Sequence, residues 1–260
     1  MMNGTVRRTG NDGVSESIGF ILIFAMVIVG IGLVTLYGYP LLLKQQTNAD
    51  EQIMEKNMIV LQNDMKSLAY KSVPYKETSM KIAGGALTVN KDSSNGPKFR
   101  ISSGGNDYLP ENRTGSLTYR SLSTQEEISL QNGAVMKRNL QGSAGSVMLA
   151  EPRWFYDRQT QTLVINVIRI NSSVLMAREG ISTVQMMLGE TDYISTGIAN
   201  PIDIYYTMDT GQDYHIAWQN YLTRTMNMDC DGSTPIMHCW TIDPVSLLVI
   251  KKTDVIVRSV

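Results

Sequence analysis

Apolar residues are continuous over one segment near the N-terminus. From Ile18 to Leu43 the chain carries no charged residue. The 22 residues from Ile18 to Tyr39 would form a helix of about 33 Å at 1.5 Å per residue, which is enough to cross a bilayer. A buried core helix is the alternative, but such a helix normally carries a polar face. The pattern therefore predicts a membrane-spanning helix.

A second helical pattern follows a short polar stretch after Leu43. Apolar residues recur at spacings of 4, 3, 4 and 3, as in the seam of a heptad repeat, at Met54, Met58, Leu61, Met65 and Leu68. Pro74 ends the pattern, so we expect helix from about Gly19 to Val73, with a bend near Pro40. The seam can pack against the protein's own globular domain or against neighbouring subunits. The first interpretation is favoured.

Beyond Pro74 the pattern changes to alternation with period two, broken by turn residues. It predicts strands within residues 80–89, 116–121, 127–130, 154–156, 162–170, 181–188, 202–208, 246–251 and 254–260. A helix is expected from Asp213 to Thr225, with its apolar face formed by Tyr214, Trp218, Tyr221 and Leu222. The fold class is therefore α+β: a long N-terminal helix, membrane-spanning and then amphipathic, followed by a β-rich domain with one later helix.

Composition adds few constraints on function. The formal net charge is −1, from 23 basic and 24 acidic side chains, so there is no sign of the concentrated basic face that binds nucleic acid. The common motifs of catalysis and phosphate binding are absent. We therefore expect neither an enzyme nor a bound cofactor.

The two cysteines, Cys230 and Cys239, enclose a short loop. In an oxidising compartment they would form a disulfide. The alternatives are two reduced thiols, or a metal pair with His238. The sequence Asp229-Cys230-Asp231-Gly232 has the acidic spacing of a calcium loop, but it lacks the remaining ligands. A polar turn is the simpler interpretation, and no metal is expected.

The residues before the apolar segment form a basic leader and a small polar stretch. Arg7 and Arg8 come first, and Asp12-Gly13-Val14-Ser15 lies directly before the helix. This arrangement, over about 35 residues, resembles the class III signal peptide of archaeal type IV pilins. The resemblance implies that a prepilin peptidase cuts between Gly13 and Val14 on the cytoplasmic side. A secretory signal would instead end in a small-residue cleavage site after the helix, which is absent here.

One position departs from the related bacterial pilins. Cleavage after Gly13 places Glu16 at the third mature position, whereas bacterial pilins carry a glutamate at the fifth. Glu16 can serve assembly, or it can be a first-turn acid favoured by the helix dipole. Gly19, Gly30 and Gly32 would let neighbouring helices approach closely.

Together these features predict four segments. They are a cleaved leader (1–13), an apolar helix in the membrane or filament core (14–43), an amphipathic stalk (44–73) and an extracellular β-rich domain (74–260). Basic residues on the two sides of the helix nearly balance, so the orientation rests on the leader and the cysteine pair. The predicted protein is a pilin-like surface subunit that associates with itself or with other pilins. The alternative is a single-pass anchored domain that acts as a ligand-binding or envelope protein and does not assemble.

Overall fold

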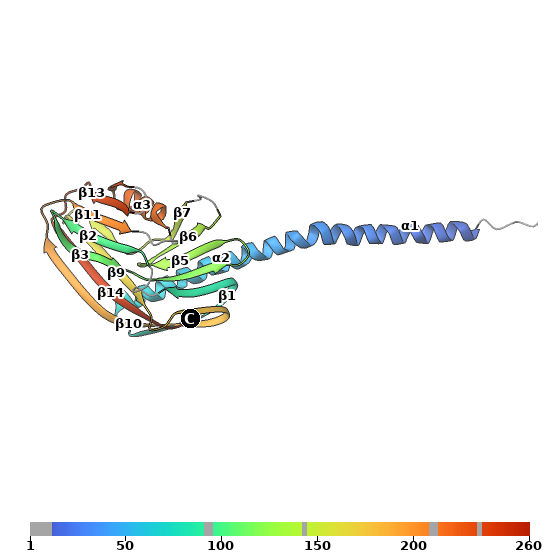
Figure 1. The fold of residues 1–260 in the computed structure, drawn as a ribbon, viewed down its shortest axis with the longest axis horizontal. Coiled ribbons are helices and arrows are strands. Elements are labelled where there is room, and N and C mark those ends of the chain that lie inside the picture. The colour runs from blue at the N-terminus through green and yellow to red at the C-terminus, as the bar shows by residue number, and fades with distance from the viewer. Residues whose placement is uncertain (1–11, 91–95, 142–144, 208–212, 233–235) are drawn as a thin grey trace, which may run out of the picture. The chain divides into compact units, whose positions relative to one another are not determined.

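The computed structural model describes residues 12–90, 96–141, 145–207, 213–232 and 236–260, without the side chains of residues 12–16. Most of the predicted leader therefore lies outside the described residues. The chain divides into two compact units between Ala49 and Asp50. We describe each unit by itself (Figure 1).

The N-terminal helical segment contains one wide turn. The α-helix α1 (Asp12–Leu33) leads into a π-helical turn η1 (Val34–Gly38), and α2 (Tyr39–Lys71) follows. In the wide turn, the backbone N–H of Tyr39 donates to the carbonyl of Val34. Pro40 has no N–H, and its ring would clash with the carbonyl four residues earlier in a regular α-turn. The π-turn relieves this clash at the place where the sequence predicts a bend.

The part of α2 from Asp50 onward belongs to the globular unit. All five apolar seam residues, from Met54 to Leu68, are fully buried in one core cluster with the strands of the main sheet. The prediction that the seam packs on its own domain is confirmed. The helix ends at Lys71, and Ser72 takes a positive φ of 51° before Pro74, which cannot continue a helix.

The main sheet has nine strands in the order β7-β6-β5-β4-β1-β10-β14-β9-β8. All neighbouring pairs are antiparallel except β14 and β9, which are parallel. Its strands in chain order are β1 (Tyr75–Asn90), β4 (Ser116–Ser121), β5 (Glu126–Gln131), β6 (Ala134–Asn139), β7 (Ser146–Ala150), β8 (Phe155–Asp157), β9 (Thr162–Asn171), β10 (Met176–Gly197) and β14 (Leu247–Ser259).

A second sheet has five strands in the order β12-β13-β11-β2-β3. Its strands are β2 (Lys98–Ser103), β3 (Asn106–Arg113), β11 (Ile202–Thr207), β12 (Met228–Asp231) and β13 (Ile236–Thr241). Helix α3 (His215–Arg224) lies against β7, β12 and β13. The fold class is α+β with strands dominant, as predicted.

Two core clusters fill the globular unit. One lies between α2 and one face of the main sheet. The other joins the opposite face of that sheet to the second sheet and α3, and it contains the predicted apolar face of α3. Aromatic rings dominate this second cluster, with centroid separations from 4.8 Å to 6.2 Å, among Phe99, Trp154, Tyr206, Trp218 and Tyr221.

The glycine pair in β1 is the site of a bulge. The register with β10 shifts between Ile82 and Leu87. Gly84 has a φ of +62°, and a Cβ added at Gly85 would lie 2.3 Å from the carbonyl oxygen of Arg120. Neither position tolerates a side chain, so glycine is needed for the bulge.

Candidate functional site

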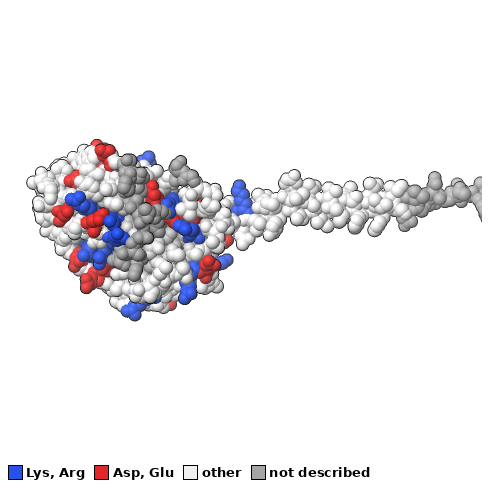
Figure 2. All heavy atoms as spheres, in the orientation of Figure 1, with Lys and Arg blue, Asp and Glu red and all other residues white. Residues whose placement is uncertain are grey.

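The first candidate site is the apolar segment from Ile18 to Leu43. Its large side chains are exposed, Met26 to 76% and Phe20 to 72%. Figure 2 shows this segment as white spheres, without the blue and red that mix over the visible face of the globular unit. The hydroxyl of Thr35 donates to the carbonyl of Ile31 at 2.8 Å, so this polar side chain is satisfied within the helix, as lipid requires.

Among the described residues, one helix contains a stretch that is long and apolar enough to cross a membrane. The helix runs from Ser17 to Lys71, its most apolar 18-residue window has a mean hydropathy of 2.8, and none of that window is buried. A helix that is apolar on every side needs lipid or other helices around it. The segment fits a single-pass membrane anchor.

The apolar segment contains four glycines, and three of them leave open space on its surface. Apart from its two chain neighbours and the backbone of its own helix, a Cβ added at Gly19, Gly30 or Gly32 would meet no atom within 4 Å. At about 100° per residue, Gly19 and Gly30 lie on the same face of the helix, while Gly32 lies on roughly the opposite face. The segment therefore offers two places where another helix could approach the backbone.

The predicted processing residues lie at the start of α1. Asp12 is the first residue of this helix, and Gly13, Val14, Ser15 and Glu16 follow in its first turns. Their side chains lie outside the described part of the structure. Cleavage after Gly13 and the role of Glu16 therefore stay predictions.

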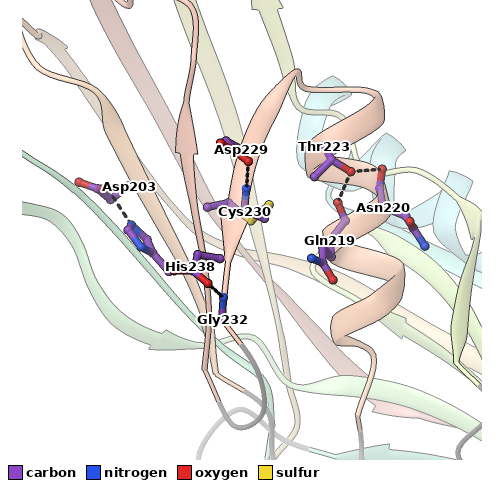
Figure 3. Close-up of a disulfide and its surroundings, with 10 residues drawn as sticks. Asp203, Gln219, Asn220, Thr223, Asp229, Cys230, Gly232 and His238 are labelled. Atoms are coloured by element: carbon purple, nitrogen blue, oxygen red, sulfur yellow. Dashed lines mark hydrogen bonds and ion pairs between the residues drawn. A yellow bond between two sulfur atoms is a disulfide. The ribbon is translucent and has the colours of Figure 1, made fainter.

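The cysteines form a disulfide across two neighbouring strands. Cys230 in β12 pairs directly with Cys239 in β13, and their sulfur atoms are bonded (Figure 3). Alternate residues of β13 point to opposite faces. His238 therefore faces away from the disulfide, and its Nε2 lies 2.8 Å from a carboxylate oxygen of Asp203. The structure does not bring His238 together with the cysteines as a metal pair.

We expect the disulfide to be present in the mature protein and to stabilise it. Non-reducing peptide mapping should recover the peptides of Cys230 and Cys239 linked to each other. The chain-entropy model gives about 2.5–3 kcal/mol for a loop of this size, so the double variant Cys230→Ser/Cys239→Ser should unfold at lower denaturant concentration. Free alkylation of both thiols without reductant would contradict this expectation.

The acidic sequence around Cys230 is an edge strand rather than a turn. The carboxylate of Asp229 accepts the backbone N–H of Cys230 at 3.0 Å, and that of Asp231 accepts the N–H of Gly232 at 2.6 Å. Each carboxylate is thus engaged by its own backbone. Within the described residues, no group of three or more His, Cys, Asp or Glu side chains is arranged to hold a metal ion.

A buried carboxylate that the sequence did not reveal joins the main sheet to α3. Glu127 is fully buried and pairs with Arg120 and Arg138, its direct neighbours on β4 and β6, both at 2.7 Å. The hydroxyl of Tyr214 also donates to Glu127 at 2.8 Å. Burial, and next the Glu127 charge, raise the pKa of Tyr214 well above its usual value. We assign this cluster a structural role, because it joins three neighbouring strands of the main sheet to the residue before α3.

The fold and the apolar segment define a class of protein: a disulfide-bonded α+β globular unit attached to one helix that fits a membrane anchor. The chain belongs to the family described as "Family of unknown function (DUF7289)", whose model matches residues 13–258. No curated protein and no solved structure matches the chain.

Proposed function

We propose that this protein is a type IV pilin-like subunit of the cell surface. A prepilin peptidase removes residues 1–13, the apolar helix holds the subunit in the membrane, and the globular unit lies outside the cell. The same helix then packs with other subunits into or onto a filament, in a structural or adhesive role rather than an enzymatic one. The observation that carries the proposal is Asp12-Gly13-Val14-Ser15 directly before an uncovered apolar helix.

Two further observations support the proposal. The family match begins at Gly13, the last residue of the predicted leader, so residues 1–12 lie outside the matched part. The disulfide suits an oxidising compartment outside the cytoplasm. An ordinary membrane anchor needs no processing site before its helix.

Mass spectrometry of the protein recovered from its native cells tests the processing step. We expect a mature chain that begins at Val14. Gly13→Leu should retain the leader, because the predicted cleavage pattern needs glycine before the cut. Gly10→Leu is the matched control, three residues upstream, and should be processed normally. Intact wild-type chains that begin at Met1, or chains that begin beyond Pro40, would contradict the proposal.

A single-pass anchored domain that never assembles is the competing proposal. This proposal also assigns the apolar helix to the membrane, but it predicts that filaments sheared from the cell surface contain none of this protein. Absence of the wild-type protein from sheared fractions, despite normal processing, would favour it.

A further inference from the structure

A basic pocket lies at the C-terminal end of α2, away from Asp50, where the globular unit begins. Its volume is about 250 Å³. It lies between the last turns of α2 and the segment before β8, and it is lined by Asn63, Lys66, Ser67, Tyr70, Lys71 and Arg153. Lys251 of β14 is a fourth cation beside it, with its Nζ 5.8 Å from the centroid of the Tyr70 ring.

None of these four cations forms an ion pair with a carboxylate of the described residues. Lys66 donates to the carbonyl of Glu151 at 3.0 Å, and Lys251 donates to the carbonyl of Ala69 at 2.7 Å. The guanidinium of Arg153 lies over the Tyr70 ring at 5.0 Å. Glu151 is an acid whose charge acts on Lys66, and its carboxylate accepts the hydroxyl of Thr225 at 2.9 Å.

The four cations carry more positive charge than is needed to balance the dipole at the C-terminus of α2. Cations are common at helix C-termini, where the aligned peptide dipoles amount to about half a negative charge. Four cations and one nearby carboxylate leave a clear positive excess. The cations also repel one another. Burial lowers the pKa of Lys66, and the charge of Arg153 lowers it further, whereas the charge of Glu151 raises it. A bound anion would relieve this repulsion.

We propose that this pocket binds one phosphate or sulfate group. Arg153 and Lys71 are exposed, Lys66 is half-buried, and all three line the pocket, so all three can donate charge-assisted hydrogen bonds to one small anion. A doubly charged oxyanion balances three neighbouring cations better than a carboxylate does. The ligand is a free anion or the phosphate or sulfate group of a larger molecule. This site does not depend on whether the subunit assembles.

Isothermal titration calorimetry on the full-length chain in detergent tests the pocket. Sodium phosphate, sodium sulfate and sodium acetate are titrated at constant ionic strength, set with sodium chloride. We expect saturable one-to-one binding of phosphate or sulfate, and at least tenfold weaker binding of acetate. Lys71→Gln and Arg153→Gln should each weaken the affinity at least tenfold.

Lys98→Gln is the control, since it removes the same charge from the second sheet, where Lys98 pairs with Glu111 at 3.0 Å. It should bind the anion as wild type does. Lys71 is exposed on the last turn of its helix, so its replacement keeps the fold. Lack of saturable binding to wild type would overturn the proposal. Equal weakening by Lys98→Gln, or no effect of Lys71→Gln and Arg153→Gln, would do the same.

Discussion

Replacing Gly30 with leucine should reduce the protein in sheared surface fractions at least tenfold, while insertion and processing continue. The leucine adds apolar surface, which lipid accepts, but it fills a gap where a neighbouring helix would approach the backbone. Apart from its two chain neighbours and the backbone of its own helix, no atom lies within 4 Å of a Cβ at this position, so the change should not disturb the monomer. Quantitative immunoblots of sheared, membrane and whole-cell fractions measure the effect.

The matched control is Ile31→Leu, which changes the shape of the neighbouring side chain without adding bulk. It should leave sheared fractions unchanged. Wild-type amounts of Gly30→Leu protein in those fractions would show that this glycine does not serve assembly.

The same assay separates the two interpretations of Glu16. In a filament core its carboxylate would need a cation, since an unpaired charge in an apolar environment costs about 3 kcal/mol or more. The α-amino group of a neighbouring subunit, freed by cleavage after Gly13, could be that cation. Glu16→Gln should then reduce filaments as Gly30→Leu does, whereas an acid that only favours its own helix dipole would leave them unchanged.

Replacing Glu127 with alanine should lower the free energy of unfolding by about 3–5 kcal/mol, the usual cost of breaking a buried ion pair by removing one partner. Arg138, whose side chain is only 10% exposed, would keep its charge and lose the carboxylate at 2.7 Å. The hydroxyl of Tyr214 would lose its acceptor as well. Guanidinium-induced unfolding, followed by tryptophan fluorescence of the full chain in detergent, measures the loss.

Glu111→Ala provides the comparison, because its pair with Lys98 lies at the surface, with the Glu111 side chain 50% exposed. An exposed pair of this kind contributes up to about 1 kcal/mol. If the two variants lose similar amounts of unfolding free energy, burial does not add to the stabilisation that Glu127 provides.

The strongly periodic parts of the fold were predictable. The apolar run, the heptad seam and the face of α3 repeat over several turns, and burial follows their pattern. The strands β8 and β9 were also predicted, and they pair with each other across the short polar segment between them. Two predicted strands near the C-terminus proved to be one, β14, since the residues between them continue the pairing with β10 and β9.

Several strands were not predicted, because tertiary pairing defines them more than their own pattern does. The six missed strands are β2, β3, β6, β7, β12 and β13. Pro110 interrupts the pattern of β3, and β12 has only four residues, two of them aspartates.

The basic pocket could not be predicted from the sequence for a related reason. The residues that line it come from α2 and from the segment before β8, and the neighbouring Lys251 comes from β14. Only the folded chain brings them together. Lys66, Lys71 and Arg153 look like ordinary surface cations in the sequence. The Glu127 cluster likewise joins three strands and the start of α3.

The position of β14 limits when the globular unit can complete its fold. This strand follows β9 and β10 in the chain, yet it lies between them in the main sheet. It is therefore synthesised after both of the strands that it joins. Until that strand emerges, β9 and β10 lack the partner that joins them. A chain that stops anywhere before Leu247 should therefore leave β8 and β9 separated from the other strands of the main sheet, and we expect such a product to be open to proteolysis.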